Sequence, residues 1–226
     1  MKISVIIPAL NESDSILTSL SSVKCQQGEF EIIVVDGGSD DGTVNIARSH
    51  AEVIASERGR AIQMNEGARH SVGDVLLFLH ADSCLSSGSL SAIEGALKDH
   101  QIVGGTFTLR FDSPRYLLRI IASFTRFRFR HFHYGDQGIF VRKEIFEQLG
   151  GFEQIPIMED LEFLKRLYKV GKVVLLPYPV VTSARRYLKH GIMHQQLLDI
   201  ALVILYLSGI KPDTLAKWYG RTDRRS

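Results

Sequence analysis

The sequence predicts an α/β fold, with a mostly parallel, doubly wound central sheet and a C-terminal helical extension. In the first hundred residues, short apolar runs alternate with segments whose apolar residues recur at helical spacing. The apolar runs at 3–7, 30–35 and 75–79 are continuous, which is typical of strands buried on both faces of a parallel sheet. Parallel strands need helical connections, and these cover the two faces of the sheet.

The first elements follow from local signals. Pro8 interrupts the first apolar run, and Asn11 is placed to cap a helix that carries apolar residues at positions 16, 17, 20 and 23. After the second strand, the loop at 36–43 is rich in turn-forming residues, and Asp41 or Thr43 is placed to cap the next helix.

The later elements are marked by proline, glycine and periodicity. Pro114 can begin a helix, and Gly150-Gly151 can end one. The expected elements after this loop are strands at 52–55, 75–79, 103–111, 139–141, 173–176 and 180–181, and helices at 61–69, 89–97, 114–124, 145–149, 159–170, 189–208 and 212–219.

Composition excludes several classes of protein. A chain of 226 residues with 45% hydrophobic and 23% charged residues is an ordinary globular protein. Its net charge of +2 by itself argues neither for nor against binding to nucleic acid. Cys25 and Cys84 lie far apart, which argues against a disulfide scaffold or a zinc site. The first apolar run is too short for a signal peptide, and the run at 197–210 is too short to span a bilayer, so we expect a cytoplasmic protein.

Polar residues follow each of the first four strands. They form the segments 8–12, 36, 56–58 and 80–82, the last of which reads His80-Ala81-Asp82. In an open parallel sheet these ends meet at one edge, where ligands bind. No Gly-x-Gly-x-x-Gly or Walker loop follows a strand, so a nucleotide would be held by carboxylates instead. Asp36 could contact a base or ribose, and Asp82 could hold a divalent cation.

Six segments in register extend this interpretation. They are "VIIPALNES" (5–13), "IIVVDGGSDDGT" (32–43), "GRAIQMNEGA" (59–68), "FLHAD" (78–82), "GDQG" (135–138) and "MEDLEF" (158–163). On these segments, roughly residues 1–190 resemble the inverting family-2 glycosyltransferases, which have the nucleotide-diphospho-sugar transferase (A-type glycosyltransferase) fold. The resemblance implies a hexosyltransferase that uses Mn²⁺ or Mg²⁺ and a nucleotide-diphospho-sugar donor, with a UDP-sugar favoured and a GDP-sugar as the alternative.

The resemblance also implies roles for individual residues. Asp160 matches the catalytic base, with Glu159 assisting it, and Asp82 matches the acid that binds the metal. The donor-binding positions that it implies are Pro8, Ala9, Asn11, Glu12, Asp36, Arg60, His80, Ala81, Asp82 and Arg186. Gly135, Asp136 and Gln137 match the acceptor side. From these roles we expect Asp36, Asp82 and Asp160 to converge around a cation-bridged diphosphate.

Two departures from the family pattern have consequences. His80 stands where the first acid of Asp-x-Asp is usual, which puts one ribose contact in doubt, although His can also bind Mn²⁺-like ions. The Gln-x-x-Arg-Trp motif of processive members is reduced to Ser183-Ala184-Arg185-Arg186-Tyr187, which favours addition of a single sugar and leaves both arginines as candidate diphosphate contacts.

Alternative functions stay open at this point. A sugar-nucleotide pyrophosphorylase would carry a Gly-rich, Arg-containing loop after the first strand, which "PALNES" is not. A degenerate nucleotide-sugar-binding or membrane-associated non-catalytic module is compatible with the altered "HAD", but not readily with the intact acid pair. Chemically, each motif residue also has a purely structural alternative: a turn for Asp36, and a helix N-terminus for Glu159 and Asp160.

The expected organisation is a catalytic domain at 1–188 and a helical extension at 189–226. Residues 1–100 would bind the donor and 101–188 the acceptor, which is a small molecule or is lipid-linked. Arginines alternate with aromatic residues at 126–134 without any nucleic-acid-binding motif. This pattern, and the apolar segment at 197–208, are compatible with peripheral contact at the inner face of the membrane. The alternative for the segment at 197–208 is a helix that packs in the core.

Overall fold

The computed structural model describes residues 1–124 and 135–223. In this part of the chain eight strands form one sheet in the order β3-β2-β1-β4-β7-β6-β8-β5. The strands are β1 (Ile3–Ala9), β2 (Phe30–Asp36), β3 (Glu52–Ala55), β4 (Val75–Phe78), β5 (Ser83–Cys84), β6 (Ile102–Phe111), β7 (Ile139–Arg142) and β8 (Lys172–Thr182). Neighbouring strands are parallel from β3 to β4 and between β6 and β8, whereas β7 and β5 run antiparallel to their neighbours. The predicted mostly parallel α/β fold is confirmed.

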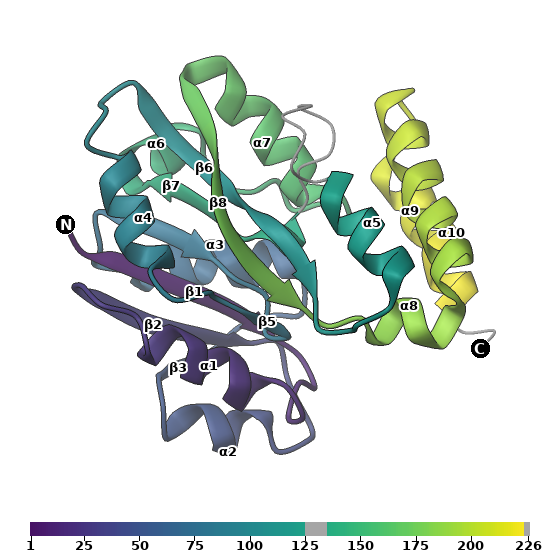
Figure 1. Cartoon of the computed structure of the whole chain (residues 1–226), viewed down its shortest axis with the longest axis horizontal. Helices are drawn as coiled ribbons and strands as arrows, with labels where there is room; N and C mark the ends of the chain where they lie inside the picture. The colour runs from purple at the N-terminus through teal and green to yellow at the C-terminus, as the bar shows by residue number, and fades with distance from the viewer. Residues whose placement is uncertain (125–134, 224–226) are drawn as a thin grey trace.

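The described helices lie on both faces of the sheet and beyond its end (Figure 1). They are α1 (Ile16–Lys24), α2 (Thr43–Arg48), α3 (Arg60–His70), α4 (Ser89–Ala96), α5 (Tyr116–Phe124), the 3₁₀ helix η1 (Gly135–Gln137), α6 (Lys143–Gln148), α7 (Glu159–Val170), α8 (Arg185–His190), α9 (Ile192–Leu207) and α10 (Pro212–Asp223). The basic and aromatic stretch at 126–134 lies outside the described residues.

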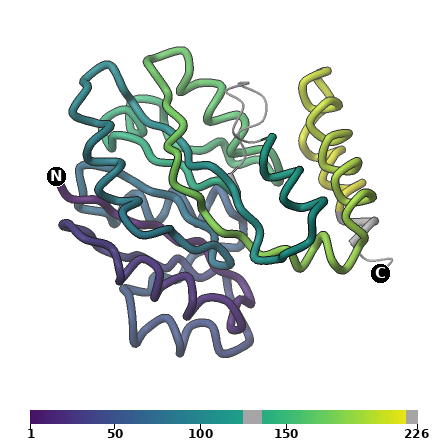
Figure 2. The backbone as a smooth tube through the Cα atoms, viewed as in Figure 1, coloured from purple at the N-terminus to yellow at the C-terminus, as the bar shows by residue number. Residues whose placement is uncertain are grey.

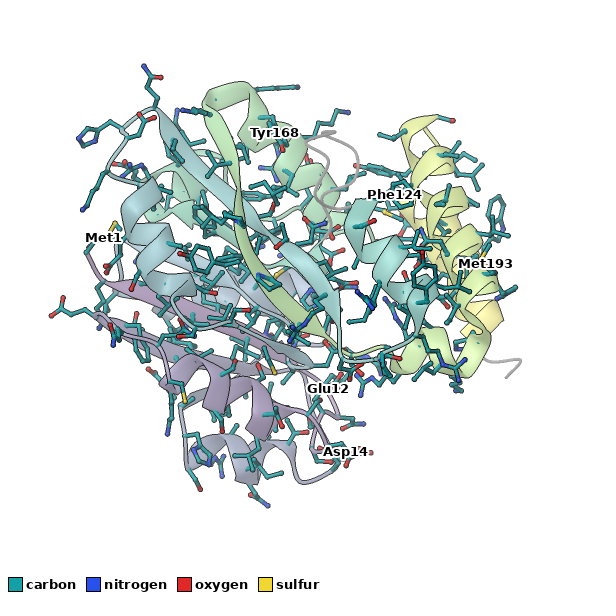
Figure 3. The ribbon with its side chains drawn as sticks, in the orientation of Figure 1. Met1, Glu12, Asp14, Phe124, Tyr168 and Met193 are labelled. Carbon is teal, nitrogen blue, oxygen red and sulfur yellow. The ribbon has the colours of Figure 1, made fainter. Side chains whose placement is uncertain are left out.

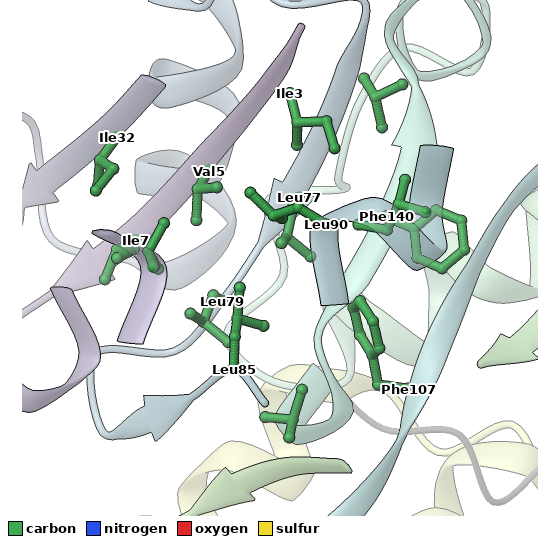
Figure 4. Close-up of a cluster of buried hydrophobic side chains, with 14 of the residues drawn as sticks. Ile3, Val5, Ile7, Ile32, Leu77, Leu79, Leu85, Leu90, Phe107 and Phe140 are labelled. Atoms are coloured by element: carbon green, nitrogen blue, oxygen red, sulfur yellow. The ribbon is translucent and has the colours of Figure 1, made fainter. Parts of the chain in front are cut away.

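The apolar runs of the central strands are continuous in sequence because helices cover both faces of the sheet. Since successive side chains point to opposite faces, Ile3, Val5 and Ile7 of β1 pack with α1 and α4. Figure 4 shows this cluster, which extends to Phe107 and Phe140. Ile6, between them in sequence, points to the other face and packs in the cluster that includes α3, α6 and α7. This two-sided burial holds the carboxyl ends of β1, β2 and β4 at one rigid edge.

The last three helices extend the molecule beyond the sheet. The backbone trace shows the N-terminus beside the sheet and the last described helices on the opposite side of the molecule (Figure 2). A third apolar cluster joins the end of β6 to α5 and α8 and contains Leu109, Phe111, Leu118, Ala122, Ala184 and Tyr187. The predicted helical extension is therefore present, and its first helix packs on the end of the sheet.

Several expected elements differ from the structure. The predicted helix at 189–208 is two helices, because Gly191 has a positive φ of 87° that stops α8 and sets a new direction. The predicted strands at 173–176 and 180–181 are one strand, β8, in which Pro177 and Tyr178 have no partner in β6. The short strand β5 was not predicted.

The two proposed effects of Pro8 and Asn11 also differ from the structure. Pro8 does not end β1. Ile6 accepts a hydrogen bond from Leu79 on the β4 side, and Pro8 faces the same side beyond the end of β4, where no ladder bond needs its missing N–H. Asn11 does not cap α1, whose N-cap is Ser15; instead Asn11 has a left-handed φ of 54°. Before α2, the Asp41 carboxylate accepts a hydrogen bond from the Thr43 N–H at 2.8 Å.

Candidate functional site

A cavity of about 460 Å³ opens at the carboxyl ends of β1 and β4, the edge at which parallel α/β sheets bind ligands. Its wall brings together predicted site residues from five separate segments of the chain. They are Pro8, Ala9, Glu12, Arg60, His80, Ala81, Asp82, Asp136 and Arg186. Figure 3 shows Glu12 where the chain leaves β1, close to the turn that leads into α8. We call this cavity the polar cavity.

Two predicted donor-binding residues, Asn11 and Asp36, are absent from the wall of the polar cavity. The buried carboxylate of Asp36 accepts hydrogen bonds from its own loop, from the Gly38 N–H at 3.0 Å and from the N–H and hydroxyl of Ser39. Asp36 therefore shapes the loop after β2, and its contact with the donor nucleotide stays a prediction.

Asn11 joins the loops that follow β1 and β2. Its N–H donates to the Ser39 hydroxyl at 2.9 Å, and its side-chain oxygen accepts from the Asp40 N–H at 3.0 Å. In the same loop, the Glu12 N–H donates to the Thr43 hydroxyl at 2.8 Å. These bonds fix the position of Glu12, which lies at the rim of the polar cavity.

Gln63 is a structural determinant of this edge that the sequence did not reveal. From α3 its buried side-chain amide donates to the carbonyls of Ala9 at 2.9 Å and Val35 at 2.8 Å, at the ends of two neighbouring strands. A Cβ at Gly37 would lie 3.1 Å from this amide, so the glycine leaves room for it. The one sequence signal is that Gln63 lies on an otherwise apolar face of the helix, which could have indicated a buried hydrogen-bond partner.

His80 and Asp136 form a pair across the polar cavity. His80 Nδ1 lies 3.1 Å from Asp136 Oδ1, and Arg186 Nη2 lies 3.9 Å from Asp136 Oδ2. Burial alone would raise the pKa of Asp136, but the hydrogen bond from His80 and the charges of His80, Arg186 and Arg60 hold it well below its usual range. His80 stands where an acid was expected, and the structure places beside it the carboxylate of Asp136, which belongs to η1.

Asp82 lies among other carboxylates. Its Oδ2 is 3.7 Å from Arg185 Nη2, and the same guanidinium pairs with Glu12. Burial raises the pKa of Asp82, and the nearby charges of Asp136 and Glu12 raise it further, against the opposing effects of His80 and Arg185. A cation at this point would relieve the repulsion between the carboxylates.

The donor set fits a metal that is shared with a ligand. Among residues 1–124 and 135–223, no group of three or more His, Cys, Asp or Glu side chains could hold an ion alone. Asp82 offers oxygen atoms, which hard cations such as Mg²⁺ and Mn²⁺ prefer, and the remaining positions would be filled by phosphate oxygens and water. Asp82 is therefore the residue that would hold the cation.

A second cavity of about 380 Å³ adjoins the first and has Glu159 and Asp160 in its wall. Arg60, Asp136, Arg186 and Tyr187 line both cavities. Arg60 Nε lies 2.9 Å from Glu159 Oε1. Burial raises the pKa of Glu159, although the charge of Arg60 opposes this effect. We call this second space the apolar cavity, because its other walls are mainly hydrophobic.

The remaining predicted residues, Gly135 and Gln137, belong to η1 and line neither cavity. Gln137 is fully buried, which leaves Asp136 as the residue of this turn that reaches the site. Tyr187 and Asp199 line the apolar cavity and were not predicted, since their importance depends on how α8 and α9 pack against each other beyond the sheet. Of the three carboxylates expected to converge, Asp82 and Asp160 line adjoining cavities, whereas Asp36 lines neither and accepts hydrogen bonds within the loop after β2.

Chemically, the arrangement combines two features. The polar cavity holds cationic side chains and a carboxylate suited to a metal-bound diphosphate, and the adjoining wall carries a carboxylate pair at the N-terminus of α7. Met158, the residue before this pair, has a left-handed φ of 68°, a conformation that side chains other than glycine adopt at some cost. This turn directs Glu159 and Asp160 into the cavity wall.

The fold is shared with known structures. The mannosyltransferase PcManGT from Pyrobaculum calidifontis, in complex with GDP-Man and Mn2+, matches with a TM-score of 0.70 at 21% identity, over 93% of this chain and 66% of that chain. S. aureus TarS 1-349 in complex with UDP-GlcNAc matches with a TM-score of 0.65 at 21% identity, over 81% of this chain and 58% of that chain.

Sequence comparison gives the family. Glycosyltransferase AglE of Haloferax volcanii is 28% identical over 201 residues, which cover 79% of this chain and 65% of AglE, so the chain spans slightly less than two thirds of that relative. Residues 4–148, more than half of the chain, match the family described as Glycosyl transferase family 2. The chain therefore belongs to glycosyl transferase family 2.

Proposed function

We propose that the protein transfers a single sugar from a nucleotide-diphospho-sugar to a hydroxyl-bearing acceptor with inversion at the anomeric carbon. The observation that carries this proposal is the continuity of the two cavities, with Asp82 in one and Asp160 in the other, and with Arg60 and Arg186 in both. The structural relatives in complex with UDP-GlcNAc and with GDP-Man and Mn2+ support the donor class. A UDP-sugar is the first candidate and a GDP-sugar the second.

In the proposed reaction the acceptor oxygen forms a bond to the anomeric carbon while the bond from that carbon to the diphosphate oxygen breaks. Asp160 accepts the hydroxyl proton, which is typically worth about 10²–10⁴-fold in rate. Arg60 and Arg186 stabilise the negative charge that develops on the diphosphate. A divalent cation bound at Asp82 would neutralise further charge on the same leaving group. Glu159, through its pair with Arg60, orients that guanidinium.

The test is a calorimetric titration with UDP, GDP, CMP and dTDP, each with and without Mn²⁺. We expect one nucleoside diphosphate to bind in a metal-dependent way, and Asp82→Asn to remove the metal dependence. Asp14→Asn is the matched control, because it removes the same charge from an exposed position. Metal-dependent binding by Asp82→Asn would reject the metal assignment, and no binding of any nucleotide would reject the donor class.

The configuration of the product tests inversion. The nucleotide that binds identifies the sugar donors to be assayed, and turnover separates an enzyme from a non-catalytic nucleotide-sugar-binding module. Retained anomeric configuration would contradict the assignment of Asp160 as the only base on the opposite face of the sugar.

We also propose that the protein contacts the inner face of the membrane peripherally through α5 and the start of α9. None of the helices in the described part of the chain has the length and hydropathy needed to cross a bilayer. Tyr116, Leu117, Ile120, Met193 and Leu197 are nevertheless exposed apolar side chains. We call them the apolar surface. Exposed basic residues lie beside it at Arg115, Arg119 and Lys189, a combination suited to anionic lipid.

A further inference from the structure

The apolar cavity differs in character from the polar cavity that it adjoins. Its hydrophobic wall comes from β6, α5 and α9, and includes Leu109, Phe111, Ile121, Ile200, Leu202 and Val203. Figure 1 shows α5 and α9 beyond the end of β6, away from the ends of β1 and β2. A volume of about 380 Å³ lies in the range of small-molecule sites, and an apolar wall favours a ligand group that leaves water on binding.

The polar groups on the α8 and α9 side of this cavity already bind one another. The Tyr187 hydroxyl donates to Asp199 Oδ2 at 3.0 Å, and the Gln195 side-chain amide donates to Asp199 Oδ1 at 2.8 Å. Tyr187 and Gln195 are buried. Because these groups satisfy one another within the protein, this side of the cavity does not require a polar ligand.

Another part of the cavity wall is charged. There the wall consists of Arg60, Asp136, Glu159 and Asp160, and two of these residues, Arg60 and Asp136, also line the polar cavity. A molecule that fills the apolar cavity would therefore present one end to Asp160 and to the donor sugar.

We infer that the acceptor is an amphiphile, whose alkyl or aryl group lies in the apolar cavity while its hydroxyl reaches Asp160. The inference rests on the proposed glycosyl transfer and names the chemical class of its acceptor. An acceptor that is polar throughout would leave the walls formed by Ile121, Leu202 and Val203 without a partner.

The experiment records the isoleucine δ1 methyl signals of the whole chain by NMR, with three glucosides as probes. They are octyl β-D-glucoside below its micelle concentration, phenyl β-D-glucoside and methyl β-D-glucoside. We expect the octyl or phenyl compound to shift the signals of Ile121 and Ile200, which line the cavity, and the methyl compound to leave them in place. The probe that binds distinguishes an alkyl group from an aryl group.

Two variants on one helix sharpen the test. Ile200→Ser should raise the dissociation constant of the bound probe about tenfold, since it removes an aliphatic contact that the bound probe would cover. Ile204→Ser, one turn further along α9 and outside the cavity, should leave it unchanged. Ile200→Val, which keeps most of the contact, should lie between wild type and Ile200→Ser and covers the case in which the serine variant does not fold.

The inference is overturned if no probe shifts Ile121 or Ile200, if methyl β-D-glucoside shifts them equally, or if the Ile204 signal moves as much as theirs. A parallel titration of the wild type with UDP and GDP separates the two proposals. Nucleotide binding without any probe effect removes only the amphiphilic acceptor, whereas absence of nucleotide binding removes the proposed donor chemistry.

Discussion

Asp160 and Glu159 lie side by side in the first turn of α7 but have different surroundings. Glu159 is almost fully buried and pairs with Arg60, whereas Asp160 is a partly exposed residue of the cavity wall. The N-terminus of a helix stabilises the ionised form of both carboxylates. The buried residue is thus suited to hold the arginine, and the more exposed one is suited to receive a proton from an incoming hydroxyl.

From this difference we predict that Asp160→Asn lowers turnover by about 10²–10⁴-fold, since the amide cannot accept the proton. Nucleotide affinity should change little, because Asp160 does not line the polar cavity. Steady-state rates and calorimetric titrations of the same preparation measure the two effects. The Asp14→Asn variant should match wild type in both, and turnover near the wild-type value in Asp160→Asn would assign the proton transfer to another group.

The Asp82 carboxylate should lower the stability of the fold, although we propose that it supports binding of the cation and the donor. Because burial raises its pKa in the folded state, ionisation of Asp82 destabilises the fold, and this loss grows as pH rises from about 4, the usual value for Asp, through the raised pKa. Asp82→Asn should therefore be more stable than wild type at pH 8 and gain less at pH 4.5. Its Tm should rise by about 2–4 °C for each kcal/mol that is relieved.

Thermal unfolding at the two pH values, with Mn²⁺ removed by a chelator, checks this expectation. Asp14→Asn again serves as the control, since that side chain is exposed. A lower Tm for Asp82→Asn at pH 8 would mean that the ion pair with Arg185 outweighs the desolvation of the carboxylate.

At the scale of elements, close packing of α3 against β1 and β2 positions Arg60 and Gln63. A Cβ at Gly67 would collide with the Ile6 side chain and lie 2.9 Å from Val35 Cγ2. In α4, by contrast, a Cβ at Gly95 would have no atom within 4 Å. Gly67 and Gly95 therefore both lie within helices, but only Gly67 faces closely packed side chains.

We predict that Gly67→Ala lowers the free energy of unfolding by about 1–3 kcal/mol, as overpacking of a core does. Gly95→Ala should raise it by about 0.5–1 kcal/mol, because alanine is the better helix former. Urea unfolding of the two variants measures both values. Equal effects in the two variants would show that α3 can move away from the sheet without cost.

The elements also show what sequence patterns can predict. Strands 30–35 and 75–79 were predicted within one residue of their observed ends because their apolar runs follow from burial on both faces, and strand 52–55 was predicted correctly although it is a partly exposed edge strand. Separate strands were predicted at 173–176 and 180–181, although the pairing of β6 and β8 continues across the bulge at Pro177 and Tyr178. Gly191, which follows Lys189 and His190 near the start of the predicted helix at 189–208, had the sequence signal of a helix end, and it was overlooked.

For the site, the strand-end argument placed Pro8, Glu12 and Asp82 at the polar cavity, because parallel topology alone brings these ends together. The partner of His80 could not be predicted in this way, since Asp136 is 56 positions away in sequence and reaches the site from η1. The same holds for Tyr187 and Asp199, which meet only after α9 turns back at Gly191.

On the scale of the whole molecule, the helices that enclose the apolar cavity also carry the apolar surface. Under the two proposals, the helices that line the site for the amphiphile are therefore the ones that contact the bilayer. We predict that the protein cosediments with vesicles of phosphatidylglycerol at low salt, and less at 0.5 M NaCl, because salt screens the basic residues beside the surface.

The double variant Leu117→Ser, Leu197→Ser should reduce cosedimentation, since both side chains belong to the apolar surface. Val72→Ser, which changes an exposed apolar residue on the loop before β4, is the control. No binding by wild type to anionic vesicles at low salt would dismiss the membrane contact and leave the glycosyl transfer untouched.

The bonds between the loops after β1 and β2 have a consequence for engineering. Asn11, Glu12 and Ser13 each donate a backbone N–H to a side chain of the other loop, and Asn11 accepts one bond in return. A chimaera that imports only segment 37–43 would lose those acceptors that the relative lacks at positions 39, 41 and 43. A graft of this region should therefore keep the local structure best when segments 10–13 and 37–43 are transferred together.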